Sequence, residues 1–170
     1  DLRVFFLKNK KKKNIYADKI TLGYLKKNFS YYFKNGLGYP AILKANKLKN
    51  DFSLGFNNEL ITFKSMKVKH GQINSIGYIF NNSAYISDCN KLSKSNIIKL
   101  KNLKYFIIDC LRFKSHPSHF SFNEVLSILK EIRPKQTILT NLHSDLDYNI
   151  LLQKMPINVK PAFDGLRLEL

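Results

Sequence analysis

The feature that most constrains this 170-residue chain is a series of apolar runs, each followed closely by a histidine or an aspartate. Runs of this length, rich in β-branched and aromatic residues, predict strands. If these strands lie side by side and run in compatible directions, one edge of the sheet collects imidazoles and carboxylates, at the edge where α/β sheets place their chemistry. The runs and the residues that follow them are 60–68 with His70, 84–87 with Asp88, 105–108 with His116 and His119, and 137–140 with His143.

The rest of the sequence predicts an α/β arrangement in one domain that covers residues 1–170. The first half of the chain is expected to be mostly strands, and in the second half strands and helices are expected to alternate. Lys-rich residues 8–13 and Gly-containing residues 30–40 are expected to be loops. Further expected strands are 14–17, 42–47, 51–56, 75–80 and a final one at 166–170; expected turns are 57–58 and 81–82; expected helices are 18–29, 94–100, 121–132 and 145–155.

The net charge of +17 attracts phosphate, but it does not by itself indicate a nucleic-acid groove. The positive residues are mostly lysines, and the chain is also rich in Asn, Ile and Phe, a combination typical of an A+T-rich genome. Compositional bias is therefore the favoured interpretation, and a phosphate-bearing substrate would still be attracted. No apolar run approaches the ~20 residues that span a bilayer. Cys89 and Cys110 form no CxxC motif, which predicts reduced, buried thiols in a cytoplasmic protein.

Each candidate site residue has a functional and an ordinary interpretation. His70, which precedes Gly71, is a strand-end metal ligand or a surface residue of a hairpin. Asp88 is a bridging metal ligand or a cap. In His116-Pro-Ser-His119, which lies before a capped helix, His119 is the stronger candidate for a functional residue.

The segment after residue 140 adds an imidazole beside two carboxylates. His143 could bind a metal, and Asp145 or Asp147 could orient its ring, although both acids could serve only the next helix. Asp164 is expected mainly in a turn, with a supporting role near the site as the alternative. Arg112 could reach a phosphate, although a surface salt bridge is the more ordinary role.

Taken together, these motifs resemble the C-terminal part of the metallo-β-lactamase-fold hydrolases, in particular the phosphodiesterase branch that includes phosphoribosyl 1,2-cyclic phosphate phosphodiesterase, a relative of tRNase Z. The segments that carry the resemblance are His70-Gly, Ser87-Asp88, Asp109-Cys110, His116-Pro-Ser-His119, Leu139-Thr-Asn-Leu-His143 and Pro161-Ala-Phe-Asp-Gly165. The resemblance implies the αββα sandwich of that fold, represented here by its C-terminal part only. The His-x-His-x-Asp-His motif of the family is not in this sequence, so we expect a chain truncated at its N-terminus.

The resemblance also implies roles for individual residues. His70 would bind one divalent ion, Asp88 would bridge two ions, and His143 would bind the other. His119 would meet the substrate phosphate or protonate the leaving oxygen. Relatives take one ligand from the position where this chain has Asn141, so His143 would have to supply the imidazole from two residues later.

The implied activity is hydrolysis of a small cyclic or linear phosphodiester by a hydroxide held between two zinc or manganese ions. With only three implied ligands, we expect weak metal binding and little turnover from this polypeptide. A tRNA 3′-processing endonuclease is the first alternative, and a non-catalytic basic nucleic-acid-binding domain is the second. The expected partner is a small phosphorylated substrate. We expect no membrane association, and binding to nucleic acid is the less favoured interpretation. A homodimer is an open alternative.

Overall fold

The computed structural model describes residues 2–36, 38–56 and 58–170, which form two compact units. One unit extends to Lys49 and the other comprises Asn50–Leu170. Each unit is described by itself, and the single domain predicted for 1–170 stays a prediction.

The N-terminal unit contains two strands and short helices. Helix α1 (Arg3–Asn9) precedes β1 (Lys13–Ala17), which pairs in parallel with β2 (Leu43–Lys47). Helix α2 (Lys19–Asn28) begins as predicted, because the Asp18 carboxylate accepts hydrogen bonds from the backbone of Ile20 (2.8 Å) and Thr21 (3.1 Å). The loop expected at 30–40 contains a short 3-10 helix, Ser30–Tyr32.

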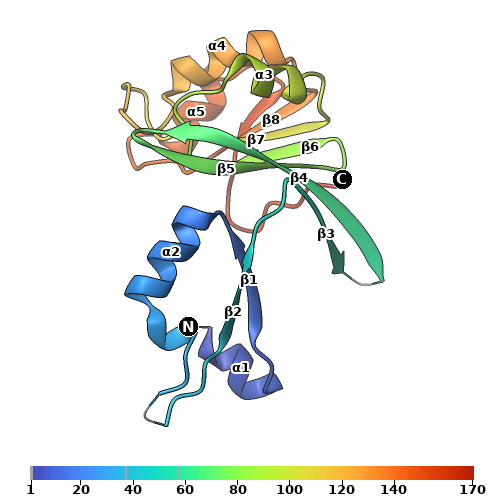
Figure 1. The fold of residues 1–170 in the computed structure, drawn as a ribbon. Coiled ribbons are helices and arrows are strands. Elements are labelled where there is room, and N and C mark those ends of the chain that lie inside the picture. The colour runs from blue at the N-terminus through green and yellow to red at the C-terminus, as the bar shows by residue number, and fades with distance from the viewer. Residues whose placement is uncertain (1, 37, 57) are drawn as a thin grey trace. The chain divides into compact units, whose positions relative to one another are not determined.

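The second unit is built on a seven-stranded sheet with the order β3-β4-β5-β6-β7-β8-β9. Strands β3 to β6 are joined by antiparallel pairing, and β6 to β9 pair in parallel. Figure 1 shows the three helices of this unit on the same side of the sheet. The elements are β3 (Asp51–Phe56), β4 (Glu59–His70), β5 (Ile73–Phe80), β6 (Ser83–Ile86), α3 (Lys94–Leu100), β7 (Tyr105–Asp109), α4 (Phe122–Ile132), β8 (Gln136–Thr140), α5 (Tyr148–Lys154) and β9 (Val159–Pro161).

The main core lies between this sheet and its helices. Strand residues Ile86, Phe106 and Ile108 are fully buried, as are Leu100 of α3 and Ile132 of α4. The capping box predicted at Ser121 and Glu124 begins α4 as expected. The mixed α/β class predicted from the sequence is confirmed.

Three local predictions are wrong. Residues 3–9, part of which was expected to be loop, form α1, which ends at Lys10 with a left-handed φ of 52°. The strand expected at 166–170 is irregular, and the last strand is instead β9, a three-residue strand ending at Pro161. The helix expected from residue 145 begins at Tyr148, because the Asp147 carboxylate accepts the Ile150 N–H at 2.9 Å and so sets the first turn.

The predicted turns involve asparagines with a left-handed backbone. Asn81 (φ 41°) and Asn82 (φ 54°) join β5 to β6, as predicted, in the conformation that suits a tight hairpin. Asn58 also has a positive φ, of 65°, before β4, whereas Asn57 lies outside the described residues. In the described part of the chain, every helix is too short or too polar to cross a bilayer.

Gly77 in the middle of β5 lies directly against the side chains of Ile86 and Met66. A Cβ built there would lie 2.9 Å from Ile86 Cγ1 and 3.2 Å from Met66 Cε. We therefore expect Gly77→Ala to lower the free energy of unfolding by about 1–3 kcal/mol in urea denaturation, because it overpacks the core. Gly55→Ala in β3 is the matched control, since its nearest contact is Glu59 O at 3.9 Å. An equal effect of the two substitutions would contradict this packing.

Both cysteine thiols are fully buried and unpaired, as the sequence predicts for packing residues. Burial raises the pKa of Cys89 and of Cys110 to about 12. We expect the native chain to resist a thiol reagent such as DTNB at pH 8, because the reactive thiolate is almost absent, and to react at both cysteines once unfolded. As the pH rises from the ordinary cysteine pKa towards 12, only the unfolded thiols ionise, so the free energy of unfolding should fall. Rapid labelling of the folded protein at pH 8 would argue against buried, protonated thiols.

Candidate functional site

The carboxyl ends of four strands meet at one edge of the seven-stranded sheet. Strand β4 runs antiparallel to β5, which runs antiparallel to β6, so β4 and β6 point the same way, and β7 and β8 are parallel to β6. His70 is the last residue of β4 and Asp109 the last of β7, while Asp88 follows β6 and Asn141 follows β8. The strand directions on which the predicted site depends are therefore present.

Three of the predicted site residues gather at this edge. His70, Asp88 and His119 each offer a ligand atom, and these atoms lie within 4.8 Å of one another. The rings of His70 and His119 meet edge to face, with centroids 4.6 Å apart. Two imidazoles and a carboxylate in this arrangement form a donor set that suits zinc or manganese.

The His70 ring is fixed by the loop that carries His119. Its Nδ1 lies 2.8 Å from the Ser118 carbonyl oxygen. A carbonyl only accepts, so Nδ1 carries the proton and Nε2 is left with a lone pair. Gly71 (φ 58°) permits the close approach of this loop, because a Cβ there would lie 3.1 Å from Ser118 Cβ.

Asn90 holds the same two segments together by its side chain. Its Oδ1 accepts the Gly71 N–H at 3.0 Å, and its Nδ2 donates to the Pro117 carbonyl at 2.8 Å. The turn after β4 and the loop 116–119 are therefore joined by the segment that follows Asp88. These hydrogen bonds join the three segments that carry His70, Asp88 and His119.

His119 is oriented by Asp109, a carboxylate that is completely buried. Asp109 Oδ2 lies 2.6 Å from His119 Nδ1 and accepts the Cys89 backbone N–H at 3.0 Å, while Oδ1 accepts Asn141 Nδ2 at 3.1 Å. Burial raises the pKa of Asp109, and the hydrogen bonds from Cys89, His119 and Asn141 act in the opposite direction. With Nδ1 donating to Asp109, His119 presents Nε2 to substrate or metal.

Asp109 and Asn141 were not assigned a role from the sequence. Asp109 ends the buried run 105–108, and a buried carboxylate at such a position needs a partner, which is the signal that could have identified it. Asn141 adopts a left-handed backbone (φ 59°) directly after β8 and lies beside His119, with Nδ2 3.3 Å from His119 Nδ1. Its amide supports Asp109.

Asp88 and His116 lie close to this arrangement. The Ser87 hydroxyl donates to Asp88 Oδ2 at 2.8 Å. The His116 ring centroid is 5.2 Å from that of His119, and its Nδ1 accepts the Ser118 N–H at 3.3 Å. Desolvation, followed by the positive charge of Arg112, lowers the pKa of His116, which favours a neutral imidazole at pH 7. Arg112 itself donates to the Lys114 (3.3 Å) and Ser115 (2.9 Å) carbonyls of the loop.

The remaining candidates lie outside the group of three that the described residues form. His143 is more than half exposed, and its Nδ1 is 3.2 Å from Asp145 Oδ1, so the predicted pairing with Asp145 is present. His143 is not part of the group formed by His70, Asp88 and His119. Asp147 caps α5. Asp164 is exposed and precedes Gly165, whose φ of 91° marks the predicted turn.

Comparison with known proteins agrees with this architecture. Residues 1–141 match the family model described as the beta-lactamase superfamily domain. The structure superposes on a diphosphatase from the PhnP family with a TM-score of 0.79 and 26% identity, covering 92% of this chain and 58% of that one. It also superposes on the metallo-beta-lactamase fold protein YhfI from Bacillus subtilis, with a TM-score of 0.66 and 18% identity, covering 90% of this chain and 63% of that one.

Two further relatives show how far the likeness extends. Human tRNase Z, short form, has the same fold, with a TM-score of 0.58 and 14% identity, covering 92% of this chain and 67% of that one. A protein named octanoyltransferase from Porphyromonas gingivalis is 26% identical over 157 residues, which are 89% of this chain and 31% of that protein. Because the match covers less than a third of that protein, its name does not transfer to this chain.

The family match over most of the chain, the 26% identity to a PhnP-family structure and the sheet edge that gathers His70, Asp88 and His119 agree with one another. The chain belongs to the beta-lactamase superfamily domain family.

Proposed function

We propose that this chain contributes to a metal-dependent phosphodiesterase that hydrolyses a small cyclic or linear phosphodiester. The observation that carries the proposal is the group of His70, Asp88 and His119 beside the buried Asp109. The 26% identity to a PhnP-family diphosphatase supports hydrolysis at a phosphoryl group, and the net charge of +17 favours an anionic substrate. The tRNA 3′-processing alternative has only a fold likeness at 14% identity in its favour.

The donor set fits one divalent ion, zinc or manganese. Hydrogen bonds of Nδ1 to Ser118 and Asp109 orient the two imidazoles so that each can offer Nε2, as is usual for metal-binding histidines. A divalent ion at such a site polarises phosphoryl oxygens and lowers the pKa of bound water. The two-ion centre implied by the family resemblance would need further ligands, and His143 is proposed as one of them. With three donors we expect the 170-residue chain to bind metal weakly.

His119 is proposed to act on the leaving oxygen of the ester. Its Nδ1–H donates to Asp109, so its second nitrogen can carry a proton toward substrate. The Asp109 carboxylate holds the ring in one orientation. Nε2 of His119 can carry this proton only while it does not bind the ion, and His70 and Asp88 would then be the ligands.

Manganese binding tests the group directly. We expect a titration followed by the electron paramagnetic resonance of free Mn²⁺ to find one weak site on the chain. His70→Ala and Asp88→Asn should abolish it, and Asp109→Asn should weaken it by roughly 10- to 100-fold, because the ring of His119 loses its charged partner.

His143→Ala is the comparison variant for this titration, since its ring faces Asp145. Less than a twofold change is expected from it in the isolated chain. Two tight sites would show that the chain holds more ligands than this group offers. Unchanged binding in His70→Ala and Asp88→Asn would rule the group out as a metal site.

Hydrolysis tests the activity itself. With Mn²⁺ present, we expect slow cleavage of bis(p-nitrophenyl) phosphate and no cleavage of precursor tRNA. His119→Ala should reduce the diester rate by at least about 10²-fold, which is the usual effect of removing a general acid. Cleavage of precursor tRNA in preference to the small diester would favour the endonuclease alternative.

A further inference from the structure

We propose that the N-terminal unit binds single-stranded nucleic acid, with one base seated in a cleft formed by Arg3, Tyr31 and Tyr39. This site lies within the unit that ends at Lys49 and shares no residue with the metal group. It is therefore independent of the proposed hydrolase function.

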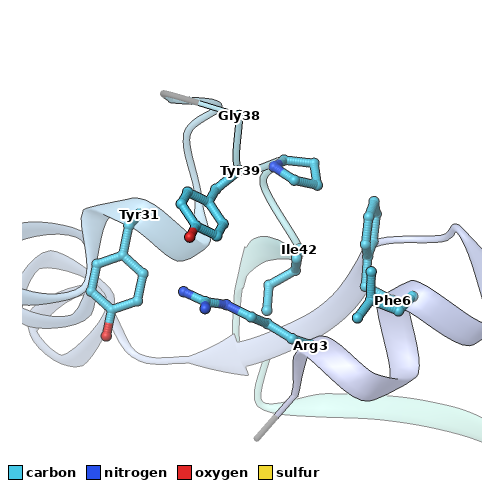
Figure 2. A pocket seen from close by; sticks show the side chains of 8 residues that line it. Arg3, Phe6, Tyr31, Gly38, Tyr39 and Ile42 are labelled. Atoms are coloured by element: carbon cyan, nitrogen blue, oxygen red, sulfur yellow. The ribbon is translucent and has the colours of Figure 1, made fainter.

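The cleft combines a cation with tyrosine rings. Figure 2 shows the Arg3 side chain extending beneath Tyr39 and towards Tyr31. The Arg3 guanidinium carbon lies 5.3 Å from the Tyr39 ring centroid and 5.9 Å from those of Tyr31 and Tyr32. Tyr31 is 48% exposed and Tyr39 64% exposed, so both rings can be reached from solvent. Exposed aromatic rings beside arginine are platforms on which bases stack.

Two cavities adjoin these three residues. One, of about 370 Å³, is closed on its apolar side by Phe6, Leu7, Pro40 and Ile42. The other, of about 380 Å³, is lined on its polar side by Ser30, Lys34, Asn35 and Gly36. Mostly apolar walls beside the charged Arg3 and Lys34 suit a flat base joined to a phosphate.

The charge of this unit points to a polymer and not to a free nucleotide. Residues 1–49 contain 13 Lys and Arg and 2 Asp and Glu, a net charge of +11 out of the chain's +17. Residues 50–170 contain 16 and 10, a net charge of only +6. Genome-wide bias enriches lysine throughout a chain, but it does not account for this concentration. One nucleotide would neutralise only one or two of these charges, whereas a strand neutralises many.

The exposed rings favour a single strand over a duplex, because the faces of paired bases are hidden in their stack. Most of the unit's positive charge is on exposed lysines, which are available to the phosphates of a strand. They are Lys8, Lys10, Lys11, Lys12, Lys19, Lys26, Lys27, Lys34, Lys44, Lys47 and Lys49.

Fluorescence anisotropy with labelled 20-nucleotide poly(U) and poly(dT) tests the proposal on the whole chain in EDTA. We expect binding to both strands, with a slope of log K against log salt steeper than about −2, as for several phosphate contacts. The double substitution Tyr31→Leu with Tyr39→Leu should weaken binding by at least about tenfold, because a stacked base is lost. Tyr31→Phe with Tyr39→Phe keeps the rings and should retain the affinity.

The matched control is Tyr85→Leu with Tyr148→Leu, two tyrosines of the second unit that are each 38% exposed. It should bind as the unchanged chain does, and so should His119→Ala. Circular dichroism of the variant with Tyr31→Leu and Tyr39→Leu shows whether it is folded. The binding retained by the corresponding phenylalanine variant then separates loss of stacking from loss of folding. Absence of binding at 100 mM salt would overturn the proposal. So would equal affinity for duplex DNA or heparin with no effect of the Tyr31 and Tyr39 substitutions, since bare charge would then suffice.

Discussion

The candidate site depends on one buried carboxylate. Asp109 is shielded from water at the end of β7, where an unpaired charge would be costly, and it is compensated by three donors from different segments. The Cys89 N–H fixes the segment just after Asp88, the His119 ring is held in one tautomer, and the Asn141 amide fixes the end of β8. A single side chain thus links three strand ends to a common centre, and its removal would loosen both His119 and the segment that carries Asp88.

The sequence predicted the members of this centre more reliably than the interactions between them. His70, Asp88 and His119 could be identified because each follows an apolar run, and their convergence required only that β4, β6 and β7 point the same way. Asp109 was not assigned a role because a polar residue at the end of a buried strand is common. Its burial depends on packing between segments that are distant in the chain. The position of the His143 side chain was likewise undetermined, because the left-handed backbone at Asn141 redirects the chain after β8.

The errors in the fold have similar local causes. Helix α1 is only seven residues long. Its apolar residues are followed directly by a lysine-rich segment, so the sequence shows no helical pattern long enough to predict it. Strand β9 has only three residues, and Pro161 has no N–H to donate, yet pairing of Val159 with Thr137 of β8 keeps it in the sheet. By contrast, α2 and α4 were predicted closely because Asp18 and the Ser121–Glu124 box cap them through side chains that are visible in the sequence.

Phosphate recognition would rest on different physics in the two units. Around Asp109 the interactions are short and shielded from water, so salt in the solvent screens them little. The charge of the N-terminal unit is carried by exposed lysines, whose attraction decays within a Debye length of about 8 Å at physiological ionic strength. Ionic strength should therefore act strongly on the proposed strand binding and weakly on the geometry of the metal group. The two proposed activities would therefore be separable without altering a residue, because salt would disrupt strand binding and chelation would remove the metal.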